Sequence, residues 1–292
     1  MVPAAQRAKL IAIVGPTASG KSNLAMRLAK DFNGEIVSAD SRMVYTGMDI
    51  GTGKPTDREQ KLVPHHLINI VNINQFFSAA EYKALAQKAI KSIQAREKTA
   101  ILVGGSGLYV DAVLFDFDFR PPPSRSERRR LEAMTVEQLN AEIAKRKLTP
   151  PLNYRNKRHL IRCIETGGAQ NIRKAMRPDA IVIGILPGSE ELKRKISSRN
   201  SKMINNGLEQ EVRGLTQRYG KEARSLDAIG YREWQDYFDG KISRQDVKNL
   251  ITNNSIAYAR RQKTWFKRNE HIKWFTSPQA AYKYAKNSLL NT

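Results

Sequence analysis

Residues 10–32 constrain the fold of this chain more than any other stretch, because they place a strand, a glycine-rich turn and a helix in succession. Leu10–Val14 is a short apolar run typical of a buried parallel strand, and residues 23–32 carry apolar side chains at helical spacing. The segment between them matches the P-loop pattern G-x-x-x-x-G-K-[ST] and consists of Gly15, Pro16, Thr17, Ala18, Ser19, Gly20, Lys21 and Ser22. Since both flanks have the required structure, we expect a true P-loop rather than a chance match in a loop.

The P-loop predicts a binding site for a diphosphate or a longer phosphate chain. Its glycines let backbone N–H groups face a bound phosphate, and the N-terminus of the following helix adds partial positive charge. Lys21 adds a full positive charge, and the hydroxyl of Ser22 can ligate a magnesium ion. We therefore expect residues 15–22 to bind a phosphate chain together with Mg²⁺, with Ser22 as the metal ligand.

The first 120 residues alternate short apolar runs with helical patterns. Residues 34–41 and 99–103 are predicted strands, and the capping box Ser78-Ala79-Ala80-Glu81 opens a helix between them. Strands that alternate with helices form a parallel sheet with helices on both faces, so the predicted fold class is α/β. Ligands of such sheets bind beyond the carboxyl ends of the strands. That rule predicts that Asp40, residues 104–107 and the P-loop lie along one edge.

The rest of the chain predicts a small helical insertion followed by a mainly helical part. Residues 121–150 form the short, charged insertion. Residues 151–292 complete the core with a strand at residues 180–186 and are otherwise mainly helical. Their longest helix should begin after the cap residue Ser243. Residues 1–120 therefore hold the first part of the P-loop core.

The net charge of +22 is the second strong signal, and it is unevenly distributed. Residues 1–120 contain 15 Lys and Arg against 11 Asp and Glu, whereas residues 121–292 contain 35 against 17. An excess of this size indicates a polyanionic partner. Nucleic acid is the leading candidate and an anionic membrane surface the weaker one. No apolar stretch approaches the length of a membrane-spanning helix.

The single cysteine, Cys163, excludes a disulfide framework within the chain and a cysteine zinc site. One cysteine fits a reducing cytoplasm, where we expect this protein. Its neighbours Ile161 and Ile164 favour a role for Cys163 as a small buried apolar residue. The four histidines lack metal-site spacing, so no zinc site is predicted.

Asp40 and residues 104–107 are candidate chemical groups at the predicted sheet edge. Asp40 can act as a general base toward a nucleophile beside a phosphate site, or can support a magnesium ion. It can equally close an Asx-turn or cap a helix, and the sequence leaves these alternatives open. Ser106 adds a hydroxyl to a segment that can also be a plain strand-to-helix turn. Residues 101–103 are followed by glycine, so a Walker-B aspartate is not visible there.

Two basic segments stand out in the second half of the chain. Arg155, Arg158 and Arg162 have the spacing of one helix stripe, which is either a solvated face or a phosphate contact. Residues 258–268 mix cations with aromatic side chains, which stack on unpaired bases or pack in the core. For Trp265 we favour core packing, because adjacent aromatics in a long amphipathic helix more often pack than stack.

A set of further motifs occurs in order along nearly the whole chain. Besides the P-loop, they occupy residues 38–41, 45–55, 64–67, 78–82, 104–109, 228–232 and 258–266. By this ordered set the chain resembles the bacterial tRNA dimethylallyltransferase family, the isopentenyltransferases that modify adenosine 37 of tRNA. The P-loop alone would be weak support, but the ordered set is highly specific.

The resemblance implies a fold and a reaction. It implies a P-loop core similar to that of nucleotide kinases, which binds dimethylallyl diphosphate, and a helical insertion that grips the anticodon arm. The N6 amine of a flipped adenosine would attack the allylic carbon, and diphosphate would leave. By position in the motifs, Asp40 would bind the amine and act as the general base. Lys21, Ser22 with magnesium, and Arg232 would stabilise the leaving diphosphate, and Ser106 stands where the family often has threonine.

The resemblance also implies contacts with tRNA, from Asp40, Ser41, Arg158, Arg162, Arg260, Arg261 and Gln262. Extrusion of the target base would explain the aromatic and basic second half. We expect a monomer, with tRNA and dimethylallyl diphosphate as its partners and no membrane contact. Two other functions fit the P-loop and the charge alone: a kinase of a small molecule, and a noncatalytic RNA-binding protein with a relic P-loop. The family motifs make both of them the weaker hypotheses.

Overall fold

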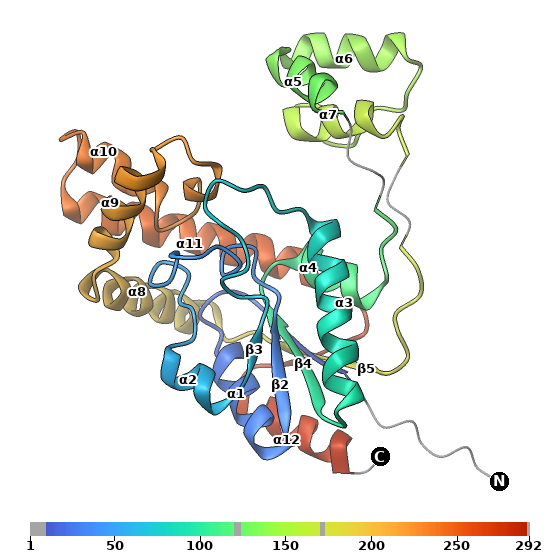
Figure 1. The fold of residues 1–292 in the computed structure, drawn as a ribbon, viewed down its shortest axis with the longest axis vertical. Coiled ribbons are helices and arrows are strands. Elements are labelled where there is room, and N and C mark those ends of the chain that lie inside the picture. The colour runs from blue at the N-terminus through green and yellow to red at the C-terminus, as the bar shows by residue number, and fades with distance from the viewer. Residues whose placement is uncertain (1–9, 120–123, 170–172, 291–292) are drawn as a thin grey trace. The chain divides into compact units, whose positions relative to one another are not determined.

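The computed structural model describes residues 10–119, 124–169 and 173–290 (Figure 1). The chain divides into two compact units. Residues 1–114 and 176–292 form a core unit, and residues 115–175 form a small unit. Residues 120–123, where the predicted insertion begins, lie outside the described residues.

A six-stranded parallel sheet forms the centre of the core unit, which confirms the predicted α/β fold class. Its order is β3-β2-β4-β1-β5-β6. The strands are β1 (Leu10–Val14), β2 (Gly34–Ser38), β3 (His65–His66), β4 (Thr99–Gly104), β5 (Ala180–Ile185) and β6 (Ile272–Phe275). The two edge strands were not predicted: β3 is only two residues long, and β6 follows the long helix with a polar residue inside it.

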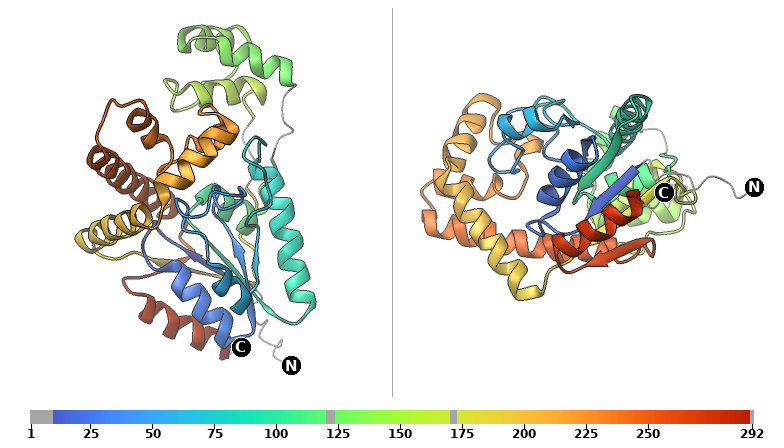
Figure 2. Two further views of the ribbon diagram at one scale, coloured as in Figure 1. Left: turned by 60° about the vertical axis from the view of Figure 1, so that its left-hand side comes forward. Right: turned by 90° about the horizontal axis from the view of Figure 1, so that it is seen from below.

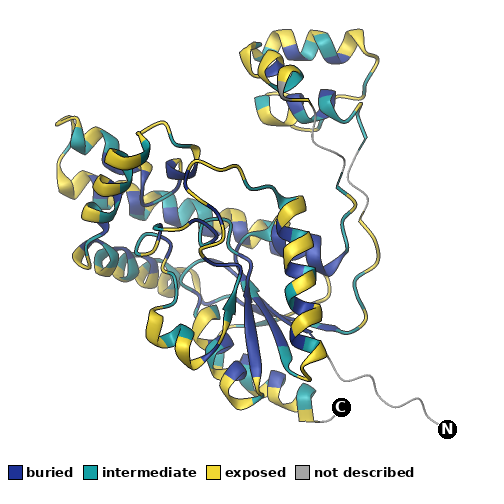
Figure 3. Cartoon of the chain, in the orientation of Figure 1, coloured by how far each residue is buried: buried dark blue, intermediate teal, exposed yellow. Residues whose placement is uncertain are grey.

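Helices cover both faces of the sheet, as the alternation of elements predicts (Figures 1 and 2). One face packs on α1 (Lys21–Asp31) and α12 (Pro278–Leu290), and the other on α3 (Ala79–Ala95) and α4 (Gly107–Leu114). Both faces of β1 and β2 are therefore buried, and apolar residues run through β1 without alternation. Figure 3 shows the buried strands between helices whose outer faces are exposed.

The C-terminal part of the core unit is mainly helical. It contains α8 (Ser189–Asn205), α9 (Leu208–Tyr219), α10 (Gln235–Phe238) and α11 (Arg244–Phe266). A further short helix, α2 (Asp57–Leu62), lies earlier in the chain, between β2 and β3. The longest helix, α11, begins at the predicted cap Ser243, whose side chain and that of Asp246 form a capping box. The helices pack around an apolar cluster that includes the fully buried Trp234. Within the described ranges, none of the helices combines the length and apolarity needed to cross a membrane.

The small unit has a hydrophobic core of its own. Its helices are α5 (Arg125–Ala133), α6 (Val136–Lys145) and α7 (Lys157–Glu165), and their buried side chains form one cluster. The unit spans residues 115–175 and is therefore wider than the predicted insertion of residues 121–150. It includes α7 because Leu160 and Ile164 pack against α6. Cys163 is buried in the same cluster, which agrees with its predicted apolar role, and burial raises the pKa of its thiol.

A buried carboxylate lies at the start of β2, at the end of the sheet opposite the P-loop. The Glu35 side chain is 4% exposed and is paired with Lys98, Arg96 and His66 at 2.7–2.8 Å. Burial alone would raise the pKa of Glu35, but hydrogen bonds from Lys98, His66 and Arg96 lower it to about 2. The ionised carboxylate is thus better stabilised in the folded chain than in the unfolded chain.

Glu35→Gln should destabilise the protein at neutral pH by up to about 3 kcal/mol. Since the pKa falls from 4.5 to about 2 on folding, this stability is fully present above pH 4.5 and is lost as the pH falls toward 2. Chemical denaturation of both proteins at several pH values checks this, with the exposed Glu222→Gln as the control. A difference between wild type and Glu35→Gln that is equally large at pH 3 and pH 7 would contradict the expectation.

Candidate active site

The P-loop forms the turn between β1 and α1, as predicted. Gly15 and Gly20 have φ values of +141° and +95°, which side-chain-bearing residues rarely adopt. A Cβ on Gly15 would also collide with the carbonyl oxygen of Ile185. Gly20 is the N-cap of α1 and offers no side-chain acceptor to the first-turn N–H groups. These N–H groups and the helix dipole make the turn a site for an anion.

The ammonium group of Lys21 lies inside this turn. Its Nζ donates a hydrogen bond to the carbonyl oxygen of Pro16 at 2.6 Å. Burial and the positive charge of Arg199 lower the pKa of Lys21 to about 7, and the negative charge of Asp40 opposes that fall. Burial and a neighbouring cation both disfavour the charged lysine, so an anion bound in the turn would stabilise it.

Arg199 is a second cation at the P-loop, and the sequence did not predict it. From α8, its Nη1 donates to Thr17 Oγ1 at 2.6 Å and its Nη2 donates to the carbonyl oxygen of Thr52 at 2.9 Å. Burial lowers the pKa of the guanidinium, and the charge of Asp40 opposes this. The helix carries several other basic residues, so nothing in the local sequence distinguished Arg199 from a solvated arginine.

Asp40 lies just beyond β2, on the same edge of the sheet. Its Oδ1 accepts hydrogen bonds from the backbone N–H groups of Arg42 at 2.8 Å and Met43 at 3.3 Å, which is the predicted turn-closing role. Its charge also acts on Lys21 and Arg199, as the pKa values of those cations show. Among the described residues, no donor is hydrogen-bonded to Oδ2. Turn closure through Oδ1 is therefore compatible with a proton-accepting role for Oδ2.

Ser106 joins the ends of β2 and β4. Its Oγ accepts from the backbone N–H of Ser41 at 2.9 Å, and its own N–H donates to the carbonyl oxygen of Ala39 at 3.1 Å. Tyr258 of α11 is hydrogen-bonded to Ser106, and burial together with the nearby Asp40 charge raises the pKa of this tyrosine to about 12. The structure thus brings together Asp40, Ser41 and Ser106, as the sheet topology predicts.

Gln262 of α11 is buried and ties the two glycine-rich segments to each other. Its Oε1 accepts from the backbone N–H of Thr17 at 2.8 Å, and its Nε2 donates to the carbonyl oxygen of Gly105 at 2.9 Å. A Cβ on Gly105 would collide with this amide, so the close approach requires glycine. The buried position gives Gln262 a role inside the site, which differs from the tRNA contact that the resemblance implies.

The aromatic residues that follow Gln262 on α11 take different roles. Phe266 is 1% exposed and belongs to the core. Trp265 is only partly buried, and its Nε1 donates to Asp111 Oδ2 at 2.8 Å. Its indole packs directly on Gly107, where no side chain would fit. Trp265 therefore holds α11 against α4 through one polar contact and one close backbone approach.

Five of the predicted site residues are arginines, three in the core unit and two in the small unit. Arg232 has a side chain 46% exposed and is paired with Asp227 at 3.2 Å and Glu233 at 3.5 Å. In the described ranges, none of its hydrogen bonds or ion pairs reaches the P-loop. Arg260 and Arg261 are exposed on α11. In the small unit, Arg158 is exposed, while Arg162 is half-buried and lies 3.5 Å from Glu165.

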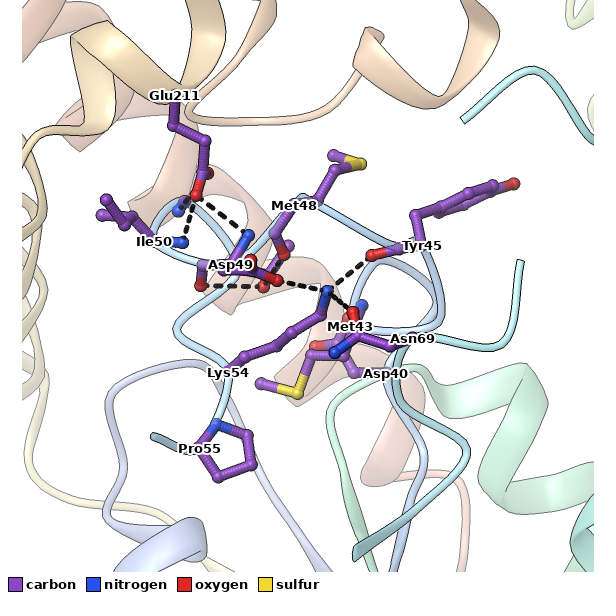
Figure 4. A network of polar contacts seen from close by, with 12 residues as sticks. Asp40, Met43, Tyr45, Met48, Asp49, Ile50, Lys54, Pro55, Asn69 and Glu211 are labelled. Atoms are coloured by element: carbon purple, nitrogen blue, oxygen red, sulfur yellow. Dashed lines mark hydrogen bonds and ion pairs between the residues drawn. The ribbon is translucent and has the colours of Figure 1, made fainter. Parts of the chain in front are cut away.

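The loop of residues 45–55 is held by a buried lysine (Figure 4). The Lys54 side chain is 3% exposed, and its Nζ donates to the carbonyl oxygen of Tyr45 at 2.5 Å, to Asp49 Oδ1 at 2.7 Å and to Asn69 Oδ1 at 2.5 Å. Burial lowers the pKa of Lys54, and the bonds to Asp49 oppose this. Three acceptors satisfy all the donors of the ammonium group, so the lysine fixes the loop.

Glu211 of α9 fixes the same loop from the other side (Figure 4). Its carboxylate accepts hydrogen bonds of 2.7–3.1 Å from the backbone N–H groups of residues 49–51, and one of 2.7 Å from the hydroxyl of Tyr231. The next residue, Thr52, supplies the carbonyl oxygen that binds Arg199. Glu211 thus supports the position of Arg199, although neither the charge pattern nor the motifs pointed to it.

The possible metal ligands at the P-loop suit a magnesium ion that is held mainly by phosphate oxygens. Ser22 lies exposed in the first turn of α1. The described residues contain no group of three or more His, Cys, Asp or Glu that could hold a metal by themselves. Mg²⁺ typically binds one or two protein ligands together with substrate phosphates and water. The residues present therefore fit Mg²⁺ only in company with a phosphate chain.

The arrangement as a whole can move a group from a phosphate chain to an acceptor. Lys21 and Arg199 both bind residues of the P-loop, beside the backbone N–H groups of the turn, and Asp40 offers a proton acceptor on the same edge. Charge that develops on a leaving phosphate would meet fixed donors in a partly buried site.

Comparison with known proteins reveals close relatives. The chain matches the model of the IPP transferase family over residues 43–269. It is 38% identical to a tRNA dimethylallyltransferase of Geobacillus kaustophilus, over 95% of this chain and 93% of the relative. It is 39% identical to that of Pediococcus pentosaceus, over 95% and 94% of the two chains. The crystal structure of the full-length tRNA isopentenylpyrophosphate transferase from Bacillus halodurans is 34% identical and superposes with a TM-score of 0.75, over 98% of both chains.

The lowered pKa of Lys21 makes the binding of a diphosphate dependent on pH. An anion favours the ammonium form, so above the free-state pKa of about 7 each binding event must take up a proton. Affinity for inorganic diphosphate should therefore fall, by up to about tenfold per pH unit, as the pH rises above 7. Titration calorimetry in buffers of different ionisation enthalpy measures both the affinity and the proton uptake.

Lys21→Arg is the matched control, because arginine stays charged throughout this pH range. Diphosphate ionises in the same way with both proteins, so the ratio of their affinities isolates the lysine. An identical pH dependence for wild type and Lys21→Arg would contradict the assignment.

Proposed function

The chain belongs to the IPP transferase family, and on that premise we propose that it transfers a dimethylallyl group from dimethylallyl diphosphate to N6 of adenosine 37 in tRNA. It is an enzyme of the prenyltransferase class. The observation that carries the proposed chemistry is the grouping at the carboxyl edge of the sheet of Lys21 and Arg199, which bind Pro16 and Thr17 of the P-loop, with Asp40, whose charge acts on both.

The P-loop would bind the diphosphate of the donor. As the allylic C–O bond breaks, negative charge grows on the leaving diphosphate, and Lys21, Arg199 and the N–H groups of α1 would stabilise it. Bound to the diphosphate and held by Ser22, Mg²⁺ would supply further neutralisation of that charge. The hydrogen bonds from Arg199 to Thr17 and Thr52 hold the Arg199 guanidinium in place before the reaction begins.

Asp40 would accept the proton of the attacking amine. The N6 nitrogen forms a bond to the allylic carbon, the carbon–oxygen bond to diphosphate breaks, and the amine proton passes to the carboxylate. Oδ1 is engaged by the backbone of Arg42 and Met43, which aims the carboxylate and leaves Oδ2 for the amine. Ser106 supports this geometry through its bond to the N–H of Ser41.

The basic residues outside the P-loop would bind the tRNA backbone. The small unit contains 14 Lys and Arg against seven Asp and Glu, and Arg158 and Arg162 lie on its α7. On the core unit, Arg260 and Arg261 project as exposed residues from α11. Contacts of this kind make binding strongly dependent on salt. The same proposal assigns the enzyme to the cytoplasm as a monomer.

Mass spectrometry of unmodified tRNA after incubation with the protein, dimethylallyl diphosphate and Mg²⁺ tests the proposal. We expect a mass gain of one dimethylallyl group, located at adenosine 37. Asp40→Asn should lower the single-turnover rate by about 10²–10⁴-fold and leave tRNA affinity almost intact, because asparagine keeps the shape but cannot take the proton. Unchanged tRNA mass would favour a noncatalytic RNA-binding protein, and tRNA-independent turnover of ATP would favour a kinase.

The variants Arg199→Ala and Arg232→Ala test which of these two arginines is the cation that stabilises the leaving group. Arg199→Ala should lower kcat by about 10²–10³-fold, because it removes a donor that acts on developing charge. Arg232→Ala should cost less than about tenfold, since Asp227 and Glu233 already pair with that arginine. Steady-state rates with saturating tRNA check this. A larger loss for Arg232→Ala would instead support the role that the family resemblance gives it.

A further inference from the structure

Phe76 is a large aromatic side chain on the surface of the core unit. It lies between β3 and α3, and 64% of it is exposed. The Arg224 guanidinium lies over its ring, 5.0 Å from the centroid. Core packing does not explain an aromatic side chain this exposed. Most of the ring surface remains open to solvent although the arginine contacts it.

Hydrogen bonds join this surface to the Asp40 loop. Ser225, which is 2% exposed, donates from Oγ to the carbonyl oxygen of Ile73 at 2.9 Å. The carbonyl oxygen of the same serine accepts from Arg42 Nη1 at 3.0 Å. The backbone N–H of Arg42 in turn donates to Asp40 Oδ1 at 2.8 Å. Hydrogen bonds therefore join the segments that carry Phe76 and Arg224 to the loop of the proposed general base.

The chemistry of this surface suits RNA better than a protein partner. Residues 72, 74 and 75 of the same loop are exposed amides: Asn72, Asn74 and Gln75. Burial raises the pKa of Tyr45, and the positive charges of Arg42 and Arg224 oppose that rise, so both cations act on Tyr45. An exposed aromatic ring among cations and amides is the composition that binds unpaired nucleotides.

We propose that Phe76 and Arg224 form a stacking subsite for the unpaired base next to the target adenosine in the anticodon loop. This inference rests on the proposed function, since it needs a tRNA whose adenosine reaches Asp40. Arg42 follows Asp40 by two residues, and its guanidinium binds the carbonyl oxygen of Ser225, the neighbour of Arg224, so one side chain links the subsite to the Asp40 loop. The base stacks on the Phe76 ring, and Arg224 contacts the adjoining phosphate. Arg42 is a positioning residue, because its guanidinium is engaged by the carbonyl oxygens of Ser225 and Asp227.

Binding and single-turnover transfer with an anticodon stem-loop RNA test the subsite. Phe76→Ala should weaken RNA binding by about 5- to 150-fold, as loss of one base–aromatic stack does. Phe76→Trp should retain the affinity, and the transfer rate at saturating RNA should stay near that of wild type in both variants. Leu290→Ala is the matched control, because Leu290 is 63% exposed on α12, and its RNA affinity should not change. Unchanged affinity in Phe76→Ala would overturn the proposal.

A double-mutant cycle then identifies the base. Stem-loops with an abasic nucleotide on one side or the other of the target adenosine are compared with Phe76→Ala and wild type. At one of the two positions the abasic RNA should lose affinity for wild type but not for Phe76→Ala. Additive losses at both positions would overturn the subsite. If the wild type transfers no dimethylallyl group to any stem-loop, the proposed function itself fails; transfer by wild type with additive losses removes this inference alone.

Discussion

The parallel register of the central sheet is the constraint on which the site depends. Val14 of β1 lies opposite Gly104 of β4 and Gly184 of β5, so these strands end together. Ser38 of β2 is paired with Val103, which brings the following residues to the same edge. The P-loop, the Asp40 loop and the turn after β4 therefore begin within a short distance of one another. Side chains from all three segments can act on one ligand, because the three backbones leave the sheet at the same level.

Side chains from distant helices then convert this edge into a defined site. Gln262 comes from α11 and binds the backbone of the P-loop and of Gly105, while Glu211 comes from α9 and binds residues 49–51. Both groups satisfy backbone donors or acceptors that would otherwise be costly to bury. The helical C-terminal part thus does more than supply basic residues. It determines the positions of loops that belong to the first third of the chain.

The electrostatics of the site suit a ligand that arrives and departs as an anion. Burial lowers the pKa values of Lys21 and Arg199, and Asp40 offsets the effect only in part. A diphosphate would relieve this unfavourable burial of like charges, which favours its binding. The same cations would strengthen their contacts as a leaving group gains charge, and this difference between ground state and transition state is what accelerates a reaction.

The sequence determined the parts of the structure that depend on local pattern. Strand β1, the P-loop turn and α1 follow one another within about twenty residues, so hydrophobic periodicity and two glycines suffice to predict them. The capping boxes at Ser78 and Ser243 are satisfied within one helical turn and occur as predicted. The ordered motifs likewise identified the family, because many short sequences match the family pattern in the same order.

The tertiary structure decided everything that requires a partner far along the chain. Arg199 contacts Thr17 across 182 residues, and the sequence around it does not differ from that of a solvated basic helix. Gln262 reaches the P-loop across 245 residues, and its buried position could not be inferred from exposed neighbours such as Arg260. Helix α7 belongs to the small unit because its apolar face packs against α6, and the sequence alone does not show which apolar faces meet. Local pattern determines an element, whereas long-range packing determines which of its side chains reach the site.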